Sequence, residues 1–298
     1  MRECLLIMQI DKVISLANKN SRIQFLALER SLRATGCSIP LSVIPYDDDL
    51  FELPKGSSWW SVPEILEWLV EEKAHPMMRK YQCLTASNYQ YVDTDVCFVR
   101  NPVEALARYN GFVVCCTDWN KPQYTYTTQS QALLSRKTST FHKTLFNAGQ
   151  FACDEALYTP KVLRAQAEQP EFVETCVKCL LHDQPGMNLL VNTADVEVTN
   201  LTLPPHCMES SWAGDYPGEY EPLWQDPERK PYLIHWAGPT LEWPLPINQL
   251  FYEFLTRDEK AEWEEHLRQK VRKRNREYER SLSLPRRVAR KVLRRNLA

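Results

Sequence analysis

The stretch YVDTDVCFVRNP, residues 91–102, places two carboxylates, Asp93 and Asp95, inside an otherwise apolar segment. Successive side chains of a strand alternate between faces, so a strand through this stretch would point both carboxylates to the same side. Burying one unpaired carboxylate costs free energy, and burying two costs more. The pattern therefore predicts either a positive partner that receives both side chains or the end of a strand.

The segments before this stretch alternate between strand and helix patterns. KVISLAN (12–18) has the composition of a strand, and IPLSVIPYDDD (39–49) reads as a strand that runs into an acidic loop. Between them, SRIQFLALERSLRATG (21–36) repeats apolar residues at helical spacing, with Ser21 as a cap and Gly36 as a stop. Strand, helix and strand within about 35 residues predict a βαβ unit and a parallel sheet.

The rest of the chain continues this alternation. The patterns predict a helix over 61–88 broken near Pro76, a strand over 89–99, a short helix over 103–109, a strand over 111–119, a polar aromatic loop over 119–131, a helix over 160–181 interrupted near Pro170, and a strand over 231–238. Residues 204–231 are dense in Pro, Trp, Tyr and acids, which predicts an ordered functional loop without regular structure.

Length and composition predict a globular protein, because 298 residues with 44% hydrophobic content are enough for one large α/β domain or two small ones. We assign residues 1–257 to one α/β domain and residues 258–298 to a basic helical extension. No apolar stretch approaches the roughly 20 residues that cross a bilayer, and MRECLLIMQIDK carries charges too early for a signal peptide. We therefore expect a cytoplasmic protein.

The ten cysteines are scattered, and Cys176 with Cys179 forms the single C-x-x-C. A four-cysteine zinc site would need a second such pair. We interpret the cysteines as mostly buried, reduced thiols.

Basic residues gather at the end of the chain. From Arg268 onward there are 13 Lys/Arg and 2 Asp/Glu, although the net charge of the whole chain is −2. In residues 281–298, Leu284, Val288 and Val292 recur four apart with arginines around them, the pattern of a basic helix lying peripherally on an anionic membrane. A solvated charged tail is the alternative. Nucleic-acid binding is disfavoured because the tail lacks the interleaved aromatic residues of a base-reading surface.

Asp93 and Asp95 suit a divalent cation, because hard cations prefer carboxylate oxygens. Their position agrees, since ligands of open α/β sheets collect at the carboxyl ends of the strands. The alternative is a strand end with solvated or helix-capping carboxylates.

Five motifs and one lysine follow one another along the chain: KVISLAN, Lys80, YVDTD, FNAGQF, HDQPGMN and IHWAG. With these motifs, residues from about 13 to 255 resemble the nucleotide-sugar glycosyltransferases of the GT-A fold. The resemblance is to the retaining group of glycogenin and the bacterial lipopolysaccharide galactosyl- and glucosyltransferases. It implies a Rossmann-like, mixed, mainly parallel sheet flanked by helices.

The resemblance implies a metal site. Asp93 and Asp95 match the D-x-D motif that holds Mn²⁺ or Mg²⁺ against the sugar diphosphate, and the cation neutralises the leaving group. His235 matches the third ligand, with Gly238 at the family's offset. A lone histidine is more often a core residue, but an imidazole beside two carboxylates favours Mn²⁺ over Mg²⁺.

The resemblance also implies roles for other residues. It assigns catalysis to Asp183 and Gln184, in a D-Q-x-x-x-N motif that Asn188 completes. It assigns the nucleotide to Leu16, Ala17, Asn18, Lys80 and Thr94 together with the two aspartates, and the donor and acceptor sugars to Asn147, Ala148, Gly149, Trp236 and Gly238. Because an amide is a weak nucleophile, Gln184 is expected to stabilise charge during front-side attack. The alternatives are an ordinary turn at Gly149 and a helix cap at Asp183.

One position departs from the family, because Leu241 occupies the place of a lysine that contacts the diphosphate. The main hypothesis is a metal-dependent, retaining transfer of a hexose from a UDP-sugar to a hydroxyl of a saccharide, lipid-linked or other acceptor. The missing lysine keeps a catalytically silent binding or scaffold domain as an alternative. A nucleotidyltransferase is less consistent, because SLANKNSR has no glycine for a phosphate loop.

Overall fold

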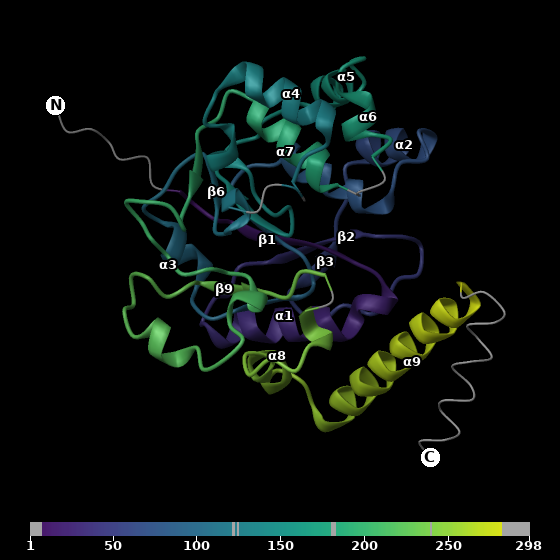
Figure 1. Cartoon of the computed structure of the whole chain (residues 1–298), viewed down its shortest axis with the longest axis vertical. Helices are drawn as coiled ribbons and strands as arrows, with labels where there is room; N and C mark the ends of the chain where they lie inside the picture. The colour runs from purple at the N-terminus through teal and green to yellow at the C-terminus, as the bar shows by residue number, and fades with distance from the viewer. Residues whose placement is uncertain (1–7, 121–122, 124, 180–182, 239, 282–298) are drawn as a thin grey trace. The chain divides into compact units, whose positions relative to one another are not determined.

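The protein is described from a computed structural model that covers residues 8–120, 123, 125–179, 183–238 and 240–281 (Figure 1). The chain divides into two compact units, Met1–Phe254 and Leu255–Ala298.

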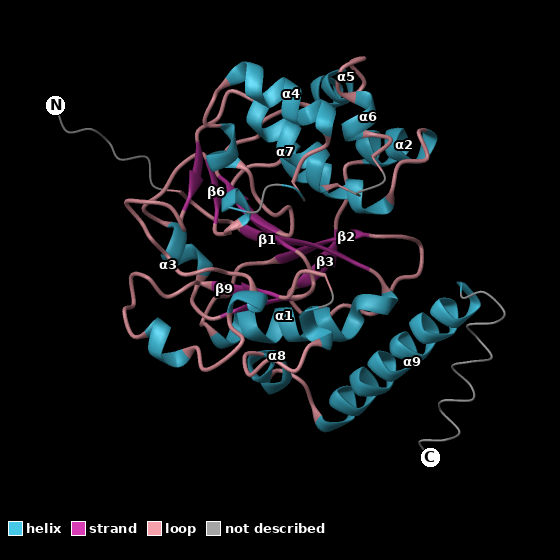
Figure 2. Ribbon diagram, viewed as in Figure 1, coloured by secondary structure: helices cyan, strands magenta, loops and turns pink. Residues whose placement is uncertain are grey.

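A seven-stranded sheet lies at the centre of the first unit, in the order β3-β2-β1-β4-β7-β6-β8, and a second sheet pairs β5 with β9 (Figure 2). The strands are β1 (Lys12–Ala17), β2 (Leu41–Pro45), β3 (Ser57–Trp59), β4 (Tyr89–Val92), β5 (Val96–Phe98), β6 (Phe112–Val114), β7 (Gln150–Cys153), β8 (Val198–Asn200) and β9 (Leu233–His235).

Helices connect these strands. The α-helices are α1 (Arg22–Ala34), α2 (Pro63–Glu71), α3 (Pro102–Leu106), α4 (Thr128–Lys137), α5 (Pro160–Ala167), α6 (Val173–Cys176), α7 (Gln184–Thr193), α8 (Asn248–Glu253) and α9 (Arg257–Ser281). The 3-10 helices are η1 (Lys19–Ser21), η2 (Pro76–Thr85), η3 (Asp118–Asn120), η5 (Phe141–Thr144), η6 (Ala213–Asp215), η7 (Glu221–Trp224) and η8 (Thr240–Glu242).

The predicted mixed, mainly parallel sheet is confirmed. β1 lies between β2 and β4 and is parallel to both, β2 is parallel to β3, and β6 is parallel to β8. Only β7 runs antiparallel to its neighbours β4 and β6 within this sheet of the described chain. The first βαβ unit, from β1 through α1 to β2, therefore has the topology that the sequence predicts.

Two apolar layers cover the faces of the sheet. One contains side chains of α2, α4, α5, α6 and α7, including the fully buried Trp68. The other contains Phe25, Leu28 and Leu32 of α1 together with the small β5-β9 sheet. In Figure 1, α1 and β9 accordingly lie on one side of the sheet and α4 and α7 on the other.

The single strand predicted over 89–99 is wrong in one respect, because the chain forms two strands in two different sheets. β4 ends at Val92, and β5 begins at Val96 and pairs with β9. The two carboxylates between them do not enter a ladder, since the interior of a sheet would leave both buried among apolar neighbours. Asp93 and Asp95 thus lie in a turn that connects the sheets.

Other predicted elements differ at their edges. The helix predicted over 61–88 is α2 followed by the 3-10 helix η2, which begins at Pro76. The loop predicted over 119–131 ends early, because Thr127 caps α4. Residues 160–181 form α5 and α6 on either side of Pro170, and the long stretch 204–231 contains only short 3-10 helices and a bridge.

The second unit contains α9, which begins with acidic residues and has basic residues toward its end. The amphipathic pattern predicted from Leu284 onward lies outside the described residues. Within the described part of the chain, each helix is too short or too polar to span a bilayer.

Candidate metal and sugar-transfer site

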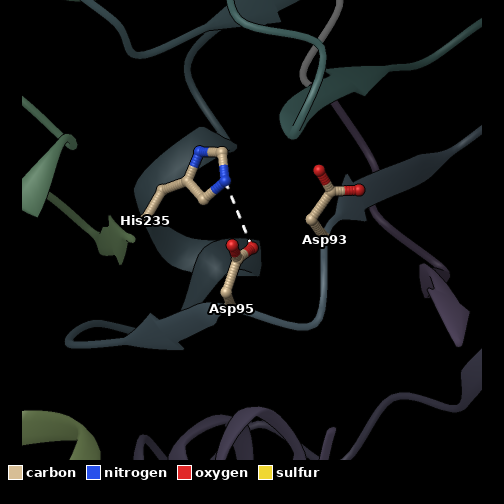
Figure 3. A group of neighbouring side chains, drawn as sticks. All are labelled: Asp93, Asp95 and His235. Carbon is tan, nitrogen blue, oxygen red and sulfur yellow. Dashed lines mark ion pairs between the residues drawn. The ribbon is translucent and has the colours of Figure 1, made fainter. Parts of the chain in front are cut away.

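Three residues that are far apart in sequence converge at the turn between β4 and β5. Asp93 and Asp95 occupy this turn, and His235 ends β9, which pairs with β5 in the register Val96↔His235. The possible ligand atoms of the three side chains all lie within 4.8 Å of one another. Figure 3 shows the two carboxylates and the imidazole facing a common space. The structure therefore brings together the three predicted metal ligands.

The chemistry of this cluster fits a divalent cation. Nε2 of His235 lies 3.3 Å from Oδ1 of Asp95, and among the described residues this buried oxygen accepts no hydrogen bond. Burial alone would lower the pKa of His235, but Asp95 and then Asp93 outweigh it and raise that pKa. Two carboxylates and an imidazole within reach of one another form a ligand set that suits a divalent cation such as Mn²⁺.

A buried lysine forms the positive side of the site. Lys80 is 1% exposed, and its Nζ lies 3.1 Å from Asp93 and 2.9 Å from Asp183. The same Nζ donates to the carbonyl oxygen of Ala148 at 3.1 Å. The expectation that Lys80 adjoins a nucleotide stays a prediction, but the structure shows that the lysine bridges two carboxylates.

The pKa values of these groups follow from burial and pairing. Burial would lower the pKa of Lys80, but Asp183 and Asp93 raise it above its usual range. Burial would raise the pKa of Asp93, but Lys80 and His235 lower it, and the Tyr91 hydroxyl donates to this carboxylate at 2.6 Å. For Asp183, burial dominates and the pKa is raised despite Lys80.

Gly149 closes one wall of the cluster. A Cβ at this position would lie 2.2 Å from Cε1 of His235 and 2.8 Å from Oδ2 of Asp93, closer than real Cβ contacts. The Gly149 carbonyl accepts from Asp93 N at 2.8 Å, and its amide donates to Oδ1 of Asn147 at 2.9 Å. A glycine fits here because its backbone approaches the side chains of His235 and Asp93 directly.

Helix α7 starts beside the same network. Asp183 precedes the helix and pairs with Lys80, and Gln184 is its first residue. Nε2 of Gln184 donates to Oδ2 of Asp118 at 3.4 Å. Asp118 was not selected from the sequence, although it follows a strand at its carboxyl end, as Asp93 does.

The predicted nucleotide segment at the end of β1 is held in place by hydrogen bonds of Asn18. The Asn18 carboxamide accepts from Asn20 N at 3.1 Å and donates to Asp47 at 2.7 Å. Ser21 precedes α1 as predicted, but its hydroxyl bonds to the Asn18 backbone instead of capping α1. Leu16, Ala17 and Thr94 are buried nearby in β1 and in the turn after β4, and their nucleotide role stays a prediction.

The segment after β9 places its predicted residues differently. The indole of Trp236 is fully buried and donates to Asn248 at 2.8 Å, and its predicted contact with a sugar stays a prediction. Gly238 has a φ of +70°, so a turn explains this glycine. Leu241 is 5% exposed, so its side chain packs inside where the family has a lysine.

Comparison with known proteins gives a result at the level of structure. No protein-family model and no curated protein matches the sequence. The bifunctional glycosyltransferase WbbM matches with a TM-score of 0.51 and 15% identity over 84% of this chain, which spans about half (52%) of WbbM. The galactosyltransferase LgtC, solved with donor and acceptor sugar analogues, also matches with a TM-score of 0.51 and 15% identity, over 84% of this chain and 99% of LgtC. The chain therefore has the GT-A fold of these glycosyltransferases, as the sequence resemblance predicts.

Proposed function

We propose that the protein is a metal-dependent glycosyltransferase that moves a hexose from a UDP-sugar to an acceptor hydroxyl with retention of configuration. One observation carries this proposal: the possible ligand atoms of Asp93, Asp95 and His235 lie within 4.8 Å of one another at the carboxyl end of β4. In open α/β sheets this edge is where ligands bind. The shared fold with WbbM and LgtC supports sugar transfer as the kind of reaction.

The metal ligands of the proposed site would be Asp93, Asp95 and His235. A bound Mn²⁺ or Mg²⁺ supplies positive charge for the departing diphosphate. Lys80 holds Asp93 and Asp183 in fixed positions through its two ion pairs. Asp183 then orients hydroxyls of the donor sugar, and Asn147 and Ala148 shape the wall next to Gly149.

Gln184 is the proposed residue beneath the anomeric carbon. Its amide donates to Asp118, so its carbonyl oxygen is directed by that contact. An amide oxygen stabilises an oxocarbenium-like centre by its dipole without forming a stable bond to it. The acceptor oxygen then attacks from the face that the diphosphate leaves and passes its proton to the departing phosphate oxygen, so that the C1–O(diphosphate) bond breaks as the new bond forms and the configuration is retained.

The silent-domain alternative is supported by Leu241, because its buried side chain supplies no charge to a diphosphate. Lys80 does not replace the missing lysine, since its charge is already shared by two carboxylates. Arg79, whose Nη1 donates to Pro45 O at 2.8 Å, is the neighbouring cation at the ends of β1 and β2. We assign neutralisation of the diphosphate charge to the metal. Arg79 would contribute further positive charge from the side where the nucleotide is proposed to bind.

The test is a comparison of the full chain with Asp95→Asn. Both proteins are incubated with a panel of UDP-sugars and Mn²⁺, and release of UDP is followed together with thermal unfolding. We expect the wild type to release UDP and to be stabilised by UDP only when Mn²⁺ is present. In Asp95→Asn the release should fall by about 100-fold or more, because the cation that would neutralise the leaving group loses one of its carboxylate ligands.

Glu228→Gln is the control, since Glu228 is an exposed acid that pairs with Arg108 away from the site. A wild type that shows the UDP and Mn²⁺ shift but no turnover with any donor would support the silent domain. Equal UDP release by wild type and Asp95→Asn would refute the metal role.

We further propose that the protein works in the cytoplasm and contacts an anionic membrane through its basic terminal segment. The charge of residues 268–298 supports this proposal. A lipid-linked acceptor would then be presented at the surface where the enzyme binds.

A further inference from the structure

Two tryptophans form an aromatic corner beside the metal site, and the proposed function has not used them. The ring centroids of Trp212 and Trp243 are 6.3 Å apart with planes at 75°. Trp243 is 41% exposed and Trp212 is half-buried. This corner (Trp212 and Trp243) presents indole surface to solvent in a fixed arrangement.

The backbone ties the corner to a metal ligand. Trp212 and His235 form a parallel bridge, and the His235 amide donates to Ser211 O at 2.7 Å. Directly paired residues on neighbouring strands project to the same face, with Cβ atoms about 5 Å apart. The indole of Trp212 therefore lies on the side of the bridge that faces the Asp93, Asp95 and His235 cluster.

Gly214 fixes the orientation of the first indole. A Cβ on Gly214 would lie 2.4 Å from Cζ2 of Trp212, so the ring lies flat against bare backbone. Any larger residue at 214 would push the indole out of this position.

Polar groups continue from the corner to the catalytic helix. The 3-10 helix η6 begins directly after Trp212 and ends with Asp215. The carboxylate of Asp215 accepts from the Thr117 hydroxyl at 3.1 Å. Asp118 follows Thr117 in the chain, and its Oδ2 accepts from Nε2 of Gln184 at 3.4 Å. A chain of contacts thus links Trp212, which pairs with His235, through Asp215, Thr117 and Asp118 to Gln184.

We infer that the Trp212 and Trp243 corner, with Asp215, is the acceptor subsite and that it recognises a pyranoside. One face of a pyranose ring is apolar and packs against an indole, while its hydroxyls donate to carboxylates. The carboxylates of Asp118 and Asp215 disfavour an anionic acceptor such as a phosphate. This inference rests on the proposed function, because it assigns the second substrate of the same reaction.

The experiment measures saccharide binding directly and does not depend on turnover. The full chain with Mg²⁺ and UDP is titrated with methyl β-galactoside, methyl β-glucoside and methyl α-mannoside, and saturation-transfer NMR detects the ring protons in contact with protein. Mg²⁺ is used because Mn²⁺ is paramagnetic. We expect transfer to the ring protons of one or more glycosides.

Trp243→Ala and Gly214→Ala should each weaken that binding by about five-fold or more, since stacking is lost in the first and misaligned in the second. Tyr278→Ala, which removes an exposed aromatic residue of α9, should bind as the wild type does. Circular dichroism checks that each variant is folded. Because Trp243 is exposed, Trp243→Ala is the variant less apt to disturb the fold.

Three results would overturn the inference: no transfer from any of the glycosides, transfer confined to the methyl aglycone, or equal binding by wild type and Trp243→Ala. Stabilisation by UDP and Mg²⁺ in the same samples reports separately on the proposed function. Loss of that stabilisation with intact, Trp243-dependent glycoside binding would refute the donor site alone.

Discussion

Gly149 is the residue at which a single methyl group reaches the metal ligands. In Gly149→Ala, the new Cβ would overlap Cε1 of His235 and approach Oδ2 of Asp93. We expect the stabilisation by UDP and Mn²⁺ to disappear, while overpacking lowers the unfolding free energy by about 1–3 kcal/mol. Thermal unfolding with and without UDP and Mn²⁺ measures both effects.

Gly218→Ala is the matched control, because a Cβ there has nothing within 4 Å and its φ is not in the left-handed region. A Gly149→Ala protein that keeps the full stabilisation would show that the ligands do not need this glycine.

Lys80 is the residue whose charge the site cannot lose. In Lys80→Met, the carboxylates of Asp93 and Asp183 remain buried without their shared cation. Leaving buried charges uncompensated costs about 3–5 kcal/mol of unfolding free energy. Urea unfolding at pH 7 should show this loss, and Lys55→Met, at an exposed lysine, should show almost none.

The loss should also depend on pH, and its sign follows from linkage. Without Lys80 the pKa of Asp183, already raised by burial, rises further, and Asp93 loses the partner that lowers its pKa most, so folding of the variant takes up more protons than folding of the wild type and the stability difference shrinks as pH falls. We expect the difference between Lys80→Met and wild type to be smaller at pH 5 than at pH 8. An equal difference at the two pH values would contradict the charge explanation.

At the scale of elements, α7 is held against the Asn147 loop by one buried side chain. Asn188 accepts from Phe146 N at 2.9 Å and donates to Phe146 O at 2.7 Å, and it also donates to the Gln184 carbonyl at 3.0 Å. One turn later, Asn192 donates to Thr144 O at 3.4 Å. The first asparagine holds the start of the helix, where Gln184 lies, and the second fastens its other end.

Asn188→Leu leaves the Phe146 amide and carbonyl without partners, which costs about 2 kcal/mol or more. Because Gln184 begins the same helix, we expect kcat of sugar transfer to fall more than KM for the donor rises. Asn192→Leu is the control on the same helix face, and it should lose stability with less effect on kcat. Equal kcat values for the two variants would show that Asn188 acts on stability alone.

Two features of the strands could not be read from local patterns. The i, i+2 spacing of Asp93 and Asp95 predicts that both side chains lie on the same face of one strand. In the structure each carboxylate has a different partner: Asp93 pairs with Lys80, and Asp95 with His235. β4 ends at Val92, before both aspartates, because extending it would place two charges inside the sheet.

At the scale of the whole molecule, the charges are separated along the chain. Residues 268–298 carry a net charge of +11 and the preceding residues −13. Each Lys or Arg near an anionic surface contributes about 1 kcal/mol to binding. The positive charge of residues 268–298 therefore predicts attraction to an anionic membrane, and the negative charge of the preceding residues weakens that attraction.

Co-sedimentation with anionic vesicles tests this prediction by comparing the full chain with one that ends at residue 280. The shorter chain lacks six Lys/Arg and should bind markedly less. Neutral vesicles are the control, and raised salt should weaken binding of the full chain because exposed charges are screened. Equal sedimentation of the two chains would refute the membrane role of the segment.

The sequence by itself determined the alternation of strands and helices, the parallel first βαβ unit, and the order of the motifs with Asp93, Asp95 and His235 among them. These follow from periodicity, caps and residue chemistry, which are properties of neighbouring residues. Only the tertiary structure decided that residues 89–99 divide between two sheets and that Lys80 is buried between Asp93 and Asp183. These depend on pairing across more than a hundred residues and on desolvation, and both are set by partners that no local pattern specifies.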